Sequence, residues 1–347
     1  MKKLYLIILI TSFILLSCRE EERLIDNTKL TWNFLAATDS DTPALMFIEL
    51  PDGIIINNDI FLTANGEQLS GRVTKMVRFR GLIYMFIPSK YKIEVISDSN
   101  FKRVATIDFS STGKEPTDIC FPNATDAYVA HGNDTTVSIV DIHDSLFRVA
   151  RSIKVGVHPV AIACSGNQIF VANQKSNTVS LIDSRTHQEE AVIQVHTAPS
   201  FIDVNNDGTK VVVLSLGAGK IDSSTKSPAK ATIITVSNHT IFKTEEIAFE
   251  AYPAIDQIPG GIVISDLDRA YMLCQENVLS MDASFGGKPY LTITGKFTNP
   301  YFDFMRIQLI LLKHNNPGFE LYVIDPNDET VKNVYVFTTD VNCILPL

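Results

Sequence analysis

Short apolar runs separated by turn residues recur along most of this chain. One clear copy comprises Ala127 to Ala130 followed by Thr136 to Asp141. The same order returns 42 residues later, with Ile169 to Asn173 followed by Thr178 to Asp183. Runs of β-branched and aromatic residues bounded by Gly, Asn, Asp and Pro are typical of antiparallel strands. Self-similarity at a period of about 40 to 50 residues predicts a propeller or a solenoid.

Fainter copies flank this pair. Each copy has an equivalent position at the end of an apolar run, and these positions are Glu49, Ser97, Asp141, Asp183, Thr235, Asp282 and Asp325. Seven units predict an all-β chain, a seven-bladed β-propeller of four-stranded antiparallel blades. The first unit is degenerate, so the sequence alone leaves six or eight blades open.

A closed ring explains why both sides of the strands are apolar. A blade stacked between two others buries both of its faces and leaves few strand edges exposed. Val137 and Ile139 would face one neighbour and Val140 the other. We expect closure to pair Val334 to Thr338 with strands near Thr31 to Ala36. A polar insertion at Lys220 to Lys230 would form a long surface loop or a loop on the binding face.

The first residues have the pattern of an export signal. Lys2 and Lys3 precede an apolar run from Leu4 to Leu16, which is shorter than the roughly 20 residues of a membrane-spanning helix. Leu15-Leu16-Ser17-Cys18 resembles the lipobox of bacterial lipoproteins, in which the Cys thiol is acylated. The alternative is an ordinary signal peptide with a chance Cys. We therefore expect a signal peptide over residues 1–17, a lipidated tether over 18–30 and one propeller domain over 31–347.

The resemblance also implies a location. Arg19 in place of Asp after the lipidated Cys18 favours the outer membrane. The run Glu20-Glu21-Glu22 is similar to an export tag for the cell surface, or it is a solvated tether. The expected product is an outer-membrane lipoprotein, facing either the periplasm or, slightly favoured, the cell surface.

Composition narrows the partners. The net charge is −9 and the pI about 5.3, which argues against a nucleic-acid partner. Four cysteines remain after Cys18, namely Cys120, Cys164, Cys274 and Cys343, without C-x-x-C spacing. We expect them to be buried apolar residues, with one disulfide as the alternative.

Residues 127–210 resemble a known propeller repeat. Tyr128-Val129-Ala130, Phe170 to Asn173, Ser176 to Asp183 and Asn206-Asp207-Gly208 are similar to the YVTN-type repeat of surface-layer and YncE-like proteins. The match is weak outside these residues, and what it implies is the seven-bladed fold.

A second resemblance covers the first third of the chain. It rests on Asn58 to Phe61, Asn65-Gly66, Leu69, Met76, Lys92 to Ile96 and Phe101-Lys102. These residues are similar to a group of propeller lipoproteins of Gram-negative bacteria, some of which capture cobalamin and pass it to a TonB-dependent outer-membrane transporter. The chain departs from that group because it lacks an N-terminal Asn-Glu-Gly segment. The resemblance implies a corrinoid such as cobalamin as ligand and such a transporter as partner.

The sequence contains candidate ligand-binding residues but no recognisable catalytic motif. The seven histidines are scattered, no G-x-S-x-G motif is present, and Asp203 to Gly208 begins like a calcium loop but has Leu214 at the twelfth position. We expect no catalytic residues, no metal site and no cofactor. Segments around five prolines recur before the next inner strand, and the resemblance to known propellers implies that these connections lead to the mouth of the channel. The candidate ligand-binding residues there are Lys114, Glu115, His158, Thr197, Tyr252, Gln257, Asn299 and Tyr301.

Three functions stay open from the sequence. The first is a non-enzymatic protein that captures a ligand or docks on a transporter. The second is a structural or adhesion module that offers a protein-binding surface. The third is an enzyme that resembles quinoprotein or lactonase propellers, which would need a quinone, a modified residue or a metal.

Overall fold

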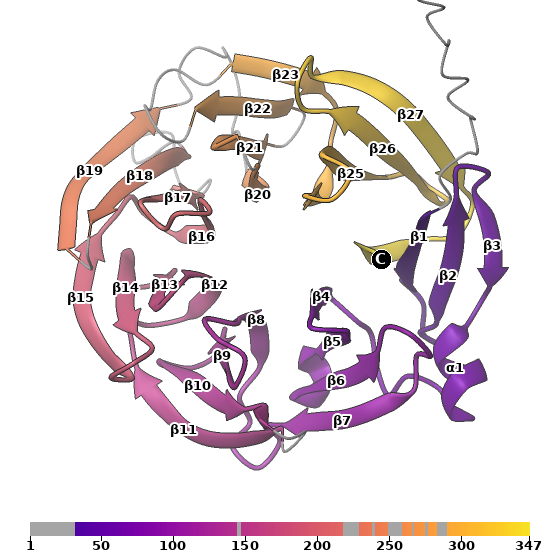
Figure 1. The fold of residues 1–347 in the computed structure, drawn as a ribbon, viewed down its shortest axis with the longest axis horizontal. Helices are drawn as coiled ribbons and strands as arrows, with labels where there is room; N and C mark the ends of the chain where they lie inside the picture. The colour runs from indigo at the N-terminus through magenta and orange to yellow at the C-terminus, as the bar shows by residue number, and fades with distance from the viewer. Residues whose placement is uncertain are drawn as a thin grey trace, which may run out of the picture.

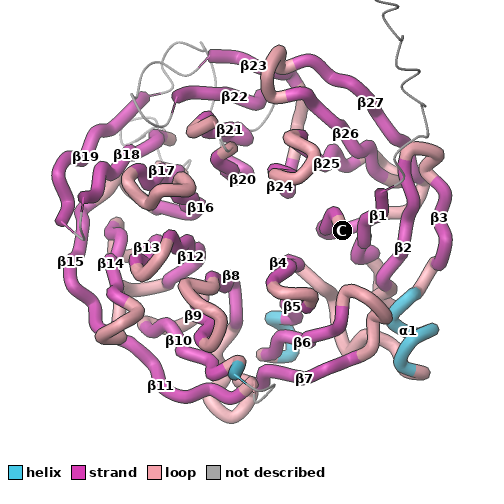
Figure 2. Tube along the Cα trace, viewed as in Figure 1, coloured by secondary structure: helices cyan, strands magenta, loops and turns pink. Residues whose placement is uncertain are grey.

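The protein is a ring of seven sheets around a central channel (Figure 1), and Figure 2 shows that strands make up nearly all of it. The computed structural model describes residues 32–143, 147–217, 229–237, 240–248, 259–265, 267–274, 277–282 and 290–347. Every sheet in these residues has four antiparallel strands. The predicted seven-bladed β-propeller is therefore confirmed.

The blades are numbered along the chain, and their strands are given from the channel outward. Blade 1 contains β28 (Val341–Pro346), β1 (Trp32–Thr38), β2 (Leu45–Leu50) and β3 (Ile54–Asn57). Blade 2 contains β4 (Lys75–Phe79), β5 (Leu82–Ile87), β6 (Lys92–Ser97) and β7 (Arg103–Asp108). Blade 3 contains β8 (Pro116–Cys120), β9 (Asp126–His131), β10 (Thr136–Asp141) and β11 (Arg148–Lys154). Blade 4 contains β12 (Pro159–Ser165), β13 (Gln168–Asn173), β14 (Thr178–Asp183) and β15 (Gln188–Gln194).

The remaining blades follow the same order. Blade 5 contains β16 (Pro199–Val204), β17 (Lys210–Ser215), β18 (Lys230–Ser237) and β19 (Thr240–Ala248). Blade 6 contains β20 (Pro259–Ile264), β21 (Arg269–Cys274), β22 (Asn277–Asp282) and β23 (Tyr290–Thr294). Blade 7 contains β24 (Thr298–Asp303), β25 (Gln308–His314), β26 (Phe319–Asp325) and β27 (Thr330–Phe337). A helix, α1 (Ile60–Asn65), and a 3₁₀ turn, η1 (Pro88–Lys90), lie in connections of blades 1 and 2. The seven repeat positions identified in the sequence all fall in the third strand of a blade.

Ring closure uses a different strand from the expected one. The expected strand, Val334 to Thr338, lies mostly in β27, the outer strand of blade 7. Instead, β28 pairs with β1, so that Phe34 lies opposite Pro346 and Ala37 opposite Cys343. Both ends of the described chain therefore share blade 1, and the two edges that an open ring would expose are paired with each other.

The core lies between the blades. Seven apolar clusters fill the seven junctions, each cluster shared by two neighbouring blades. Val137 and Ile139 belong to the cluster of blades 3 and 4, whereas Val140 belongs to that of blades 2 and 3, as the alternation predicts. Each large aliphatic side chain buried in this way contributes about 1.5–3 kcal/mol, which makes the junctions the main source of stability.

Buried tyrosines link two pairs of neighbouring blades, blades 3 and 4 and blades 6 and 7. Tyr84, Tyr128 and Tyr271 occupy the second strand of their blades and are fully buried. The Tyr271 hydroxyl donates to the carbonyl oxygen of Pro326 in blade 7 at 3.3 Å, and the Tyr128 hydroxyl meets Nδ1 of His187 in blade 4. A buried hydroxyl needs such a partner, so these contacts fix the blades relative to one another.

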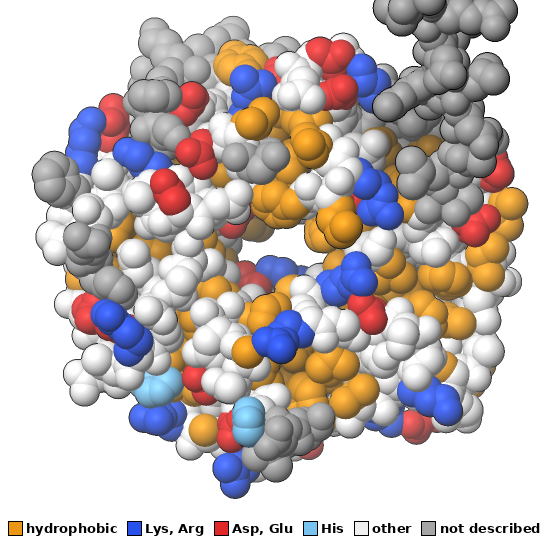
Figure 3. Space-filling model, in the orientation of Figure 1, with side chains coloured by type: hydrophobic (Ala, Val, Ile, Leu, Met, Phe, Trp, Pro, Cys, Tyr) orange, Lys and Arg blue, Asp and Glu red, His pale blue; other side chains and the backbone are white. Residues whose placement is uncertain are grey.

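The ring has two distinct faces. Loops joining second to third strands, together with the connections between blades, form what we call the upper face. Loops joining first to second and third to fourth strands form the lower face, where β1 begins at Trp32 and β28 ends. Figure 3 shows the lower face, with the channel open at its centre and charged side chains visible inside.

None of the helices in the described residues has the length and apolar character needed to cross a membrane.

The cysteines of the described chain carry free thiols. Cys120, Cys274 and Cys343 are buried, as expected, and Cys164 is partly buried.

Candidate functional site

A repeated irregularity of the backbone shapes the mouth of the channel. The inner strands of blades 3 to 6 start at Pro116, Pro159, Pro199 and Pro259, and each pairs with its neighbour through a register shift directly after the proline. A β-bulge of this kind re-aims the side chains that follow it. The residues that face the channel mouth therefore come one or two positions after the proline.

The connection before the proline turns sharply. His158 and Asn299, which directly precede Pro159 and Pro300, have φ angles of 62° and 48°, and Ala198 before Pro199 has 58°. Left-handed backbone is costly for residues with a side chain, but here it is fixed by hydrogen bonds. The His158 N–H donates to the Asp134 carbonyl at 3.0 Å and the Ala198 N–H to Asn177 Oδ1 at 2.9 Å. The turn is thus a rigid part of the upper face.

A cavity of about 410 Å³ lies at the mouth of the channel, which we call the mouth cavity. It is lined by Thr74, Lys75, Pro88, Thr117, Asp118, Val160, Ala161, Ser200, Phe201, Ile202, Gly260, Gly261, Ile262, Asn299 and Pro300. The lining is mixed, with mainly apolar residues from blades 4 to 6 and mainly polar residues from blades 2, 3 and 7. Binding sites for small molecules commonly combine an apolar wall with a few polar groups in this way.

Lys75 and Asp118 form the charged part of the mouth cavity. The Lys75 ammonium on β4 pairs with Oδ1 of Asp118 on β8. The Lys75 side chain is 42% exposed, whereas that of Asp118 is only 9% exposed. An ammonium has three donors, so Lys75 keeps donors for a ligand after it has bound Asp118.

The two channel carboxylates join neighbouring blades. Asp118 accepts the backbone N–H of Ile162 on β12 at 3.2 Å, and Asp203 on β16 accepts that of Ile264 on β20 at 2.7 Å. Each carboxylate also accepts the N–H of the residue that follows it, at 2.8 Å for Ile119 and 2.9 Å for Val204. Inner strands of adjacent blades are not paired as a sheet, so these aspartates satisfy backbone donors that would otherwise be unpaired.

Burial raises the pKa of Asp203 to about 6, even though the N–H groups of Ile264 and Val204 favour the charged form. The nearby Lys75 lowers this pKa and Asp118 raises it. Asp203 therefore changes charge near neutral pH, unlike an ordinary surface aspartate.

A second cavity, of about 240 Å³, lies beside the mouth cavity where blades 7, 1 and 2 meet. Asn299, Tyr301, Lys75, Arg78 and Cys343 are among its lining residues. The Asn299 side chain donates from Nδ2 to the Asn342 carbonyl at 3.0 Å, and burial raises the pKa of Tyr301. Both residues therefore belong to the channel wall.

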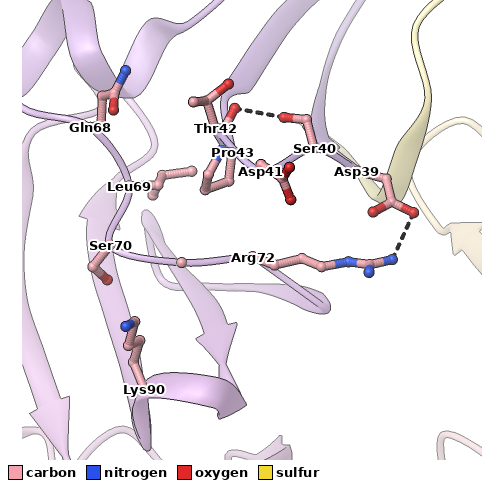
Figure 4. A pocket seen from close by; sticks show the side chains of 11 residues that line it. Asp39, Ser40, Asp41, Thr42, Pro43, Gln68, Leu69, Ser70, Arg72 and Lys90 are labelled. Atoms are coloured by element: carbon pink, nitrogen blue, oxygen red, sulfur yellow. Dashed lines mark hydrogen bonds and ion pairs between the residues drawn. The ribbon is translucent and has the colours of Figure 1, made fainter.

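A polar pocket of about 630 Å³ opens on the upper face between blades 1 and 2 (Figure 4). Arg72 reaches Asp39 through Nη2 at 2.7 Å, and Lys90 lies at the other end of the view. Gly71 packs closely on the turn at η1, because a Cβ there would lie 2.8 Å from Ile87 Cγ2. Residues 71–75 and 88–90 lie between the polar pocket and the mouth cavity. Arg72 and Lys90 of these segments line the pocket, and Lys75 and Pro88 line the mouth cavity.

Four predicted residues lie on the upper face but do not line the mouth cavity. The Lys114 ammonium donates to Thr136 Oγ1 at 2.7 Å and pairs with Asp134 at 2.9 Å. Although partial burial alone would raise the pKa of Asp134, hydrogen bonds from Lys114, Thr136 and the backbone of Thr135 bring it to about 2. Lys114 is thus occupied in holding its own loop.

Glu115, His158 and Thr197 complete this group. Burial, together with the charge of Lys175, lowers the pKa of His158, while the charge of Glu115 raises it. The backbone carbonyl of Thr197 accepts the Gly217 N–H at 2.9 Å. These residues form the rim around the mouth. Tyr252 and Gln257, as well as Cys18 and most of the insertion at Lys220 to Lys230, lie outside the described residues.

The sequence interpretation missed Lys75, Asp118 and Asp203. Two of them leave a trace in the aligned repeats, because Asp118 corresponds to Ala161 and Asp203 to Ala163 in blade 4. A carboxylate at a position where another repeat has alanine is not needed for the strand itself, which indicates that it makes a specific contact near the channel. Lys75 leaves no comparable trace, since blade 2 matches the repeat only weakly.

Among the described residues, no three His, Cys, Asp or Glu side chains come close enough together to hold a metal ion. The Lys75, Asp118 and Asp203 arrangement offers hydrogen bonds and charge to a ligand.

Sequence comparison gives no relatives, since neither a known protein family nor a curated protein matches the chain. Solved structures do resemble it. A candidate 6-phosphogluconolactonase from Bacteroides uniformis gives a TM-score of 0.70 at 10% identity, with 91% of this chain and 99% of that chain covered. One from Bacteroides fragilis gives 0.68 at 10% identity, with 92% and 99% covered. Hydrazine synthase of Kuenenia stuttgartiensis gives 0.58 at 15% identity, with 70% and 73% covered. The protein is therefore a seven-bladed β-propeller whose structural neighbours include lactonase-like propellers.

Proposed function

We propose that this chain is a non-enzymatic binding protein that captures a ligand on its upper face and is held at the outer membrane by a lipid on Cys18. The observation that carries the proposal is the mouth cavity, where Lys75 keeps donors available while Asp118 is held by backbone N–H groups. A site of this kind binds and orients an acceptor group through the Lys75 ammonium.

The size of the upper-face cavities indicates the kind of ligand. The mouth cavity measures about 410 Å³ and the polar pocket about 630 Å³, and they share a wall. A ligand larger than either cavity can therefore place one polar arm against Lys75 and extend over the wall toward Arg72 and Lys90. A corrinoid, which carries amide arms and a phosphate on a wide ring, has this chemistry. The similarity of residues 58–102 to cobalamin-capturing lipoproteins supports the same ligand.

A TonB-dependent transporter is the partner that this function requires, because a ligand captured outside the outer membrane still has to cross it. The rim that contains Lys114, Glu115, His158 and Thr197 surrounds the mouth and would be the first surface to meet such a partner. In this arrangement the predicted rim residues act in docking and the channel residues act in holding the ligand.

Calorimetric titration of the chain from Arg19 to Leu347 with cyanocobalamin tests the proposal. Lys75→Met should weaken binding by about tenfold, the loss expected for one hydrogen bond to a charged group. Lys175→Met is the matched control, because Lys175 is an exposed upper-face lysine that lines neither cavity. Absence of heat with the wild-type chain would refute the corrinoid as ligand, and equal losses in both variants would refute the role of Lys75.

A lactonase-like enzyme is the second candidate, favoured by the structural neighbours described as candidate 6-phosphogluconolactonases. Lys75 would then bind the phosphate of the substrate. Hydrolysis of 6-phosphogluconolactone that is faster than the uncatalysed reaction and is lost in Lys75→Met would replace the binding proposal with this one.

A further inference from the structure

The lower face carries an apolar patch beside the channel. Leu267, Phe304, Met305 and Ile307 have exposed fractions of 60%, 52%, 92% and 43%, and we call them the lower-face patch. Figure 3 shows apolar side chains gathered over the loop between β24 and β25 at this place. Scattered exposed apolar residues are ordinary, but four large ones in two neighbouring loops are a feature of interaction surfaces.

The patch replaces polar turns of the other blades. Loops at the same place in blades 3, 4 and 5 contain Asn123, Asn167 and Asn206-Asp207-Gly208. In blade 7 the corresponding residues are Phe304, Met305, Arg306 and Ile307. A turn needs Asn, Asp or Gly for its backbone, not large apolar side chains, so folding of the turn does not explain them.

The apolar loop is held rigidly outward. Asp303 Oδ1 accepts the N–H groups of Met305 at 3.0 Å and of Arg306 at 3.1 Å, and Oδ2 accepts from Arg306 Nη1 at 2.6 Å. The Phe304 ring packs edge-on against Phe302, with centroids 5.0 Å apart. Met305 therefore projects from a fixed turn, and ordering the loop on contact costs little entropy.

The start of the described chain lies next to this loop. The Arg306 guanidinium lies over the Trp32 ring, 5.2 Å from its centroid. Fourteen residue steps separate Trp32 from Cys18, and an extended chain covers at most about 3.6 Å per residue, or about 50 Å in all. A lipid on Cys18 would therefore keep the membrane within about 50 Å of the lower-face patch, on the side where β1 begins.

We infer that the lower-face patch contacts the lipid surface that holds the chain's own anchor, with Met305 and Phe304 inserted between the lipids. The inference rests on the proposed lipidation of Cys18. The tether keeps the membrane at a high local concentration, which a diffusing protein partner would not match. The charge of Arg306 is balanced by Asp303 and the whole chain is acidic, so insertion of apolar side chains, and not attraction to anionic lipids, drives the contact.

The contact gives the ring a fixed orientation. Before the ring meets a partner, the lower face lies against the membrane, while the mouth cavity and the polar pocket face away from it and are open to ligand. Docking of the upper-face rim on a membrane-embedded transporter then requires the ring to leave this contact. An anchor at Cys18 alone would leave the orientation of the ring undefined, whereas an anchor and an apolar loop together define one.

Flotation with phosphatidylcholine vesicles at about millimolar lipid tests the contact without the lipid anchor, because this concentration replaces the local concentration that the anchor would supply. The chain from Arg19 to Leu347 contains all seven blades and both closing strands, so it folds without residues 1–18. We expect the wild-type chain to float with the vesicles and Met305→Asp to lower the bound fraction by about tenfold. Val157→Asp is the matched control, because Val157 is a 46% exposed apolar residue of the upper face.

A second measurement follows the loop directly. Phe304→Trp should show a blue shift of its emission on addition of vesicles, whereas Val157→Trp should not. Wild-type protein that stays unbound, Met305→Asp that floats like the wild type, or an unchanged Phe304→Trp spectrum would overturn the inference. Mass spectrometry of the N-terminal peptide from membrane-extracted protein tests lipidation of Cys18 separately. Absence of lipidation can therefore be distinguished from absence of the membrane contact.

Discussion

Replacing Asp203 by Asn should change how stability depends on pH. The pKa of Asp203 is about 6 in the folded protein against an ordinary value of 3.8. Because the folded pKa is raised, the carboxyl contributes stability that is fully present below the unfolded pKa and is lost as pH rises through the folded pKa. The shift of roughly 2 units corresponds to about 3 kcal/mol in total, of which about 2.5 kcal/mol is lost between about pH 4 and pH 7.

Asp203→Asn removes this titration while it retains an acceptor oxygen for Ile264. The variant loses one backbone contact at every pH, a constant cost of about 1 kcal/mol. The assay is urea unfolding of both proteins from about pH 4 to pH 8. The wild-type free energy of unfolding, relative to that of the variant, should fall by about 2.5 kcal/mol over this range.

The difference between the two proteins isolates Asp203 from the other titrating groups. Asp134 and Asp328, for example, have pKa values of about 2, so the stability they contribute is lost only at lower pH. Two stability curves that run parallel between about pH 4 and pH 8 would show that Asp203 is not held in a charge-disfavouring site, and the reasoning about the channel would be wrong.

Three further predictions concern the framework. Gly318→Ala should destabilise the fold far more than Gly113→Ala. An added Cβ at Gly318, where φ is 98°, would lie 2.0 Å from the Phe337 carbonyl oxygen, whereas no atom lies within 4 Å of an added Cβ at Gly113, where φ is 63°. Similar decreases of Tm in the two variants would contradict this prediction. Phe170→Ala should lower the free energy of unfolding, measured by chemical denaturation, by about 3–5 kcal/mol, because the ring is fully buried between blades 4 and 5. A loss below about 1 kcal/mol would show instead that the neighbouring side chains move in to fill the cavity. Deleting residues 341–347 removes β28 and exposes the edge of β1, so we expect loss of the single cooperative transition and self-association in gel filtration; a monomer with an unchanged transition would mean that closure is dispensable.

The blade count could be predicted because each repeat ends with a recognisable third strand. Val137, Ile139 and Val140 already carried the information that both faces of a blade are buried. Closure could not be predicted, because Val341 to Pro346 contains Asn342 and ends in a proline, which makes it a weaker strand pattern than Val334 to Phe337. β28 is favoured because the closed ring leaves the inner edge of β1 unpaired, and β28 pairs with that edge. This depends on the tertiary structure and cannot be recognised in the local sequence.

The candidate site was predicted only in its location. The recurring prolines did mark the mouth of the channel. The bulge after each proline, however, turns the side chains that follow the proline toward the mouth, and not those that precede it. A bulge adds a residue without changing the apolar pattern, so this pattern alone does not show that Asp118 faces the cavity and Lys114 the rim. The role of Lys75 depends on blades 2 and 3 meeting at the axis, which is a contact between residues 43 positions apart.

Ring closure has a mechanical consequence. β1 is hydrogen-bonded along both of its edges, to β28 on the channel side and to β2 on the other. Tension applied to the N-terminal segment along the strand reaches Trp32 first and loads both rows of bonds in shear, so that many bonds must break together. Tension across the strand would break them one after another at a much lower force. β1 and β28 would thus carry the load that a lipid anchor on Cys18 places on the propeller, and this pairing cannot form until β28 has been synthesised.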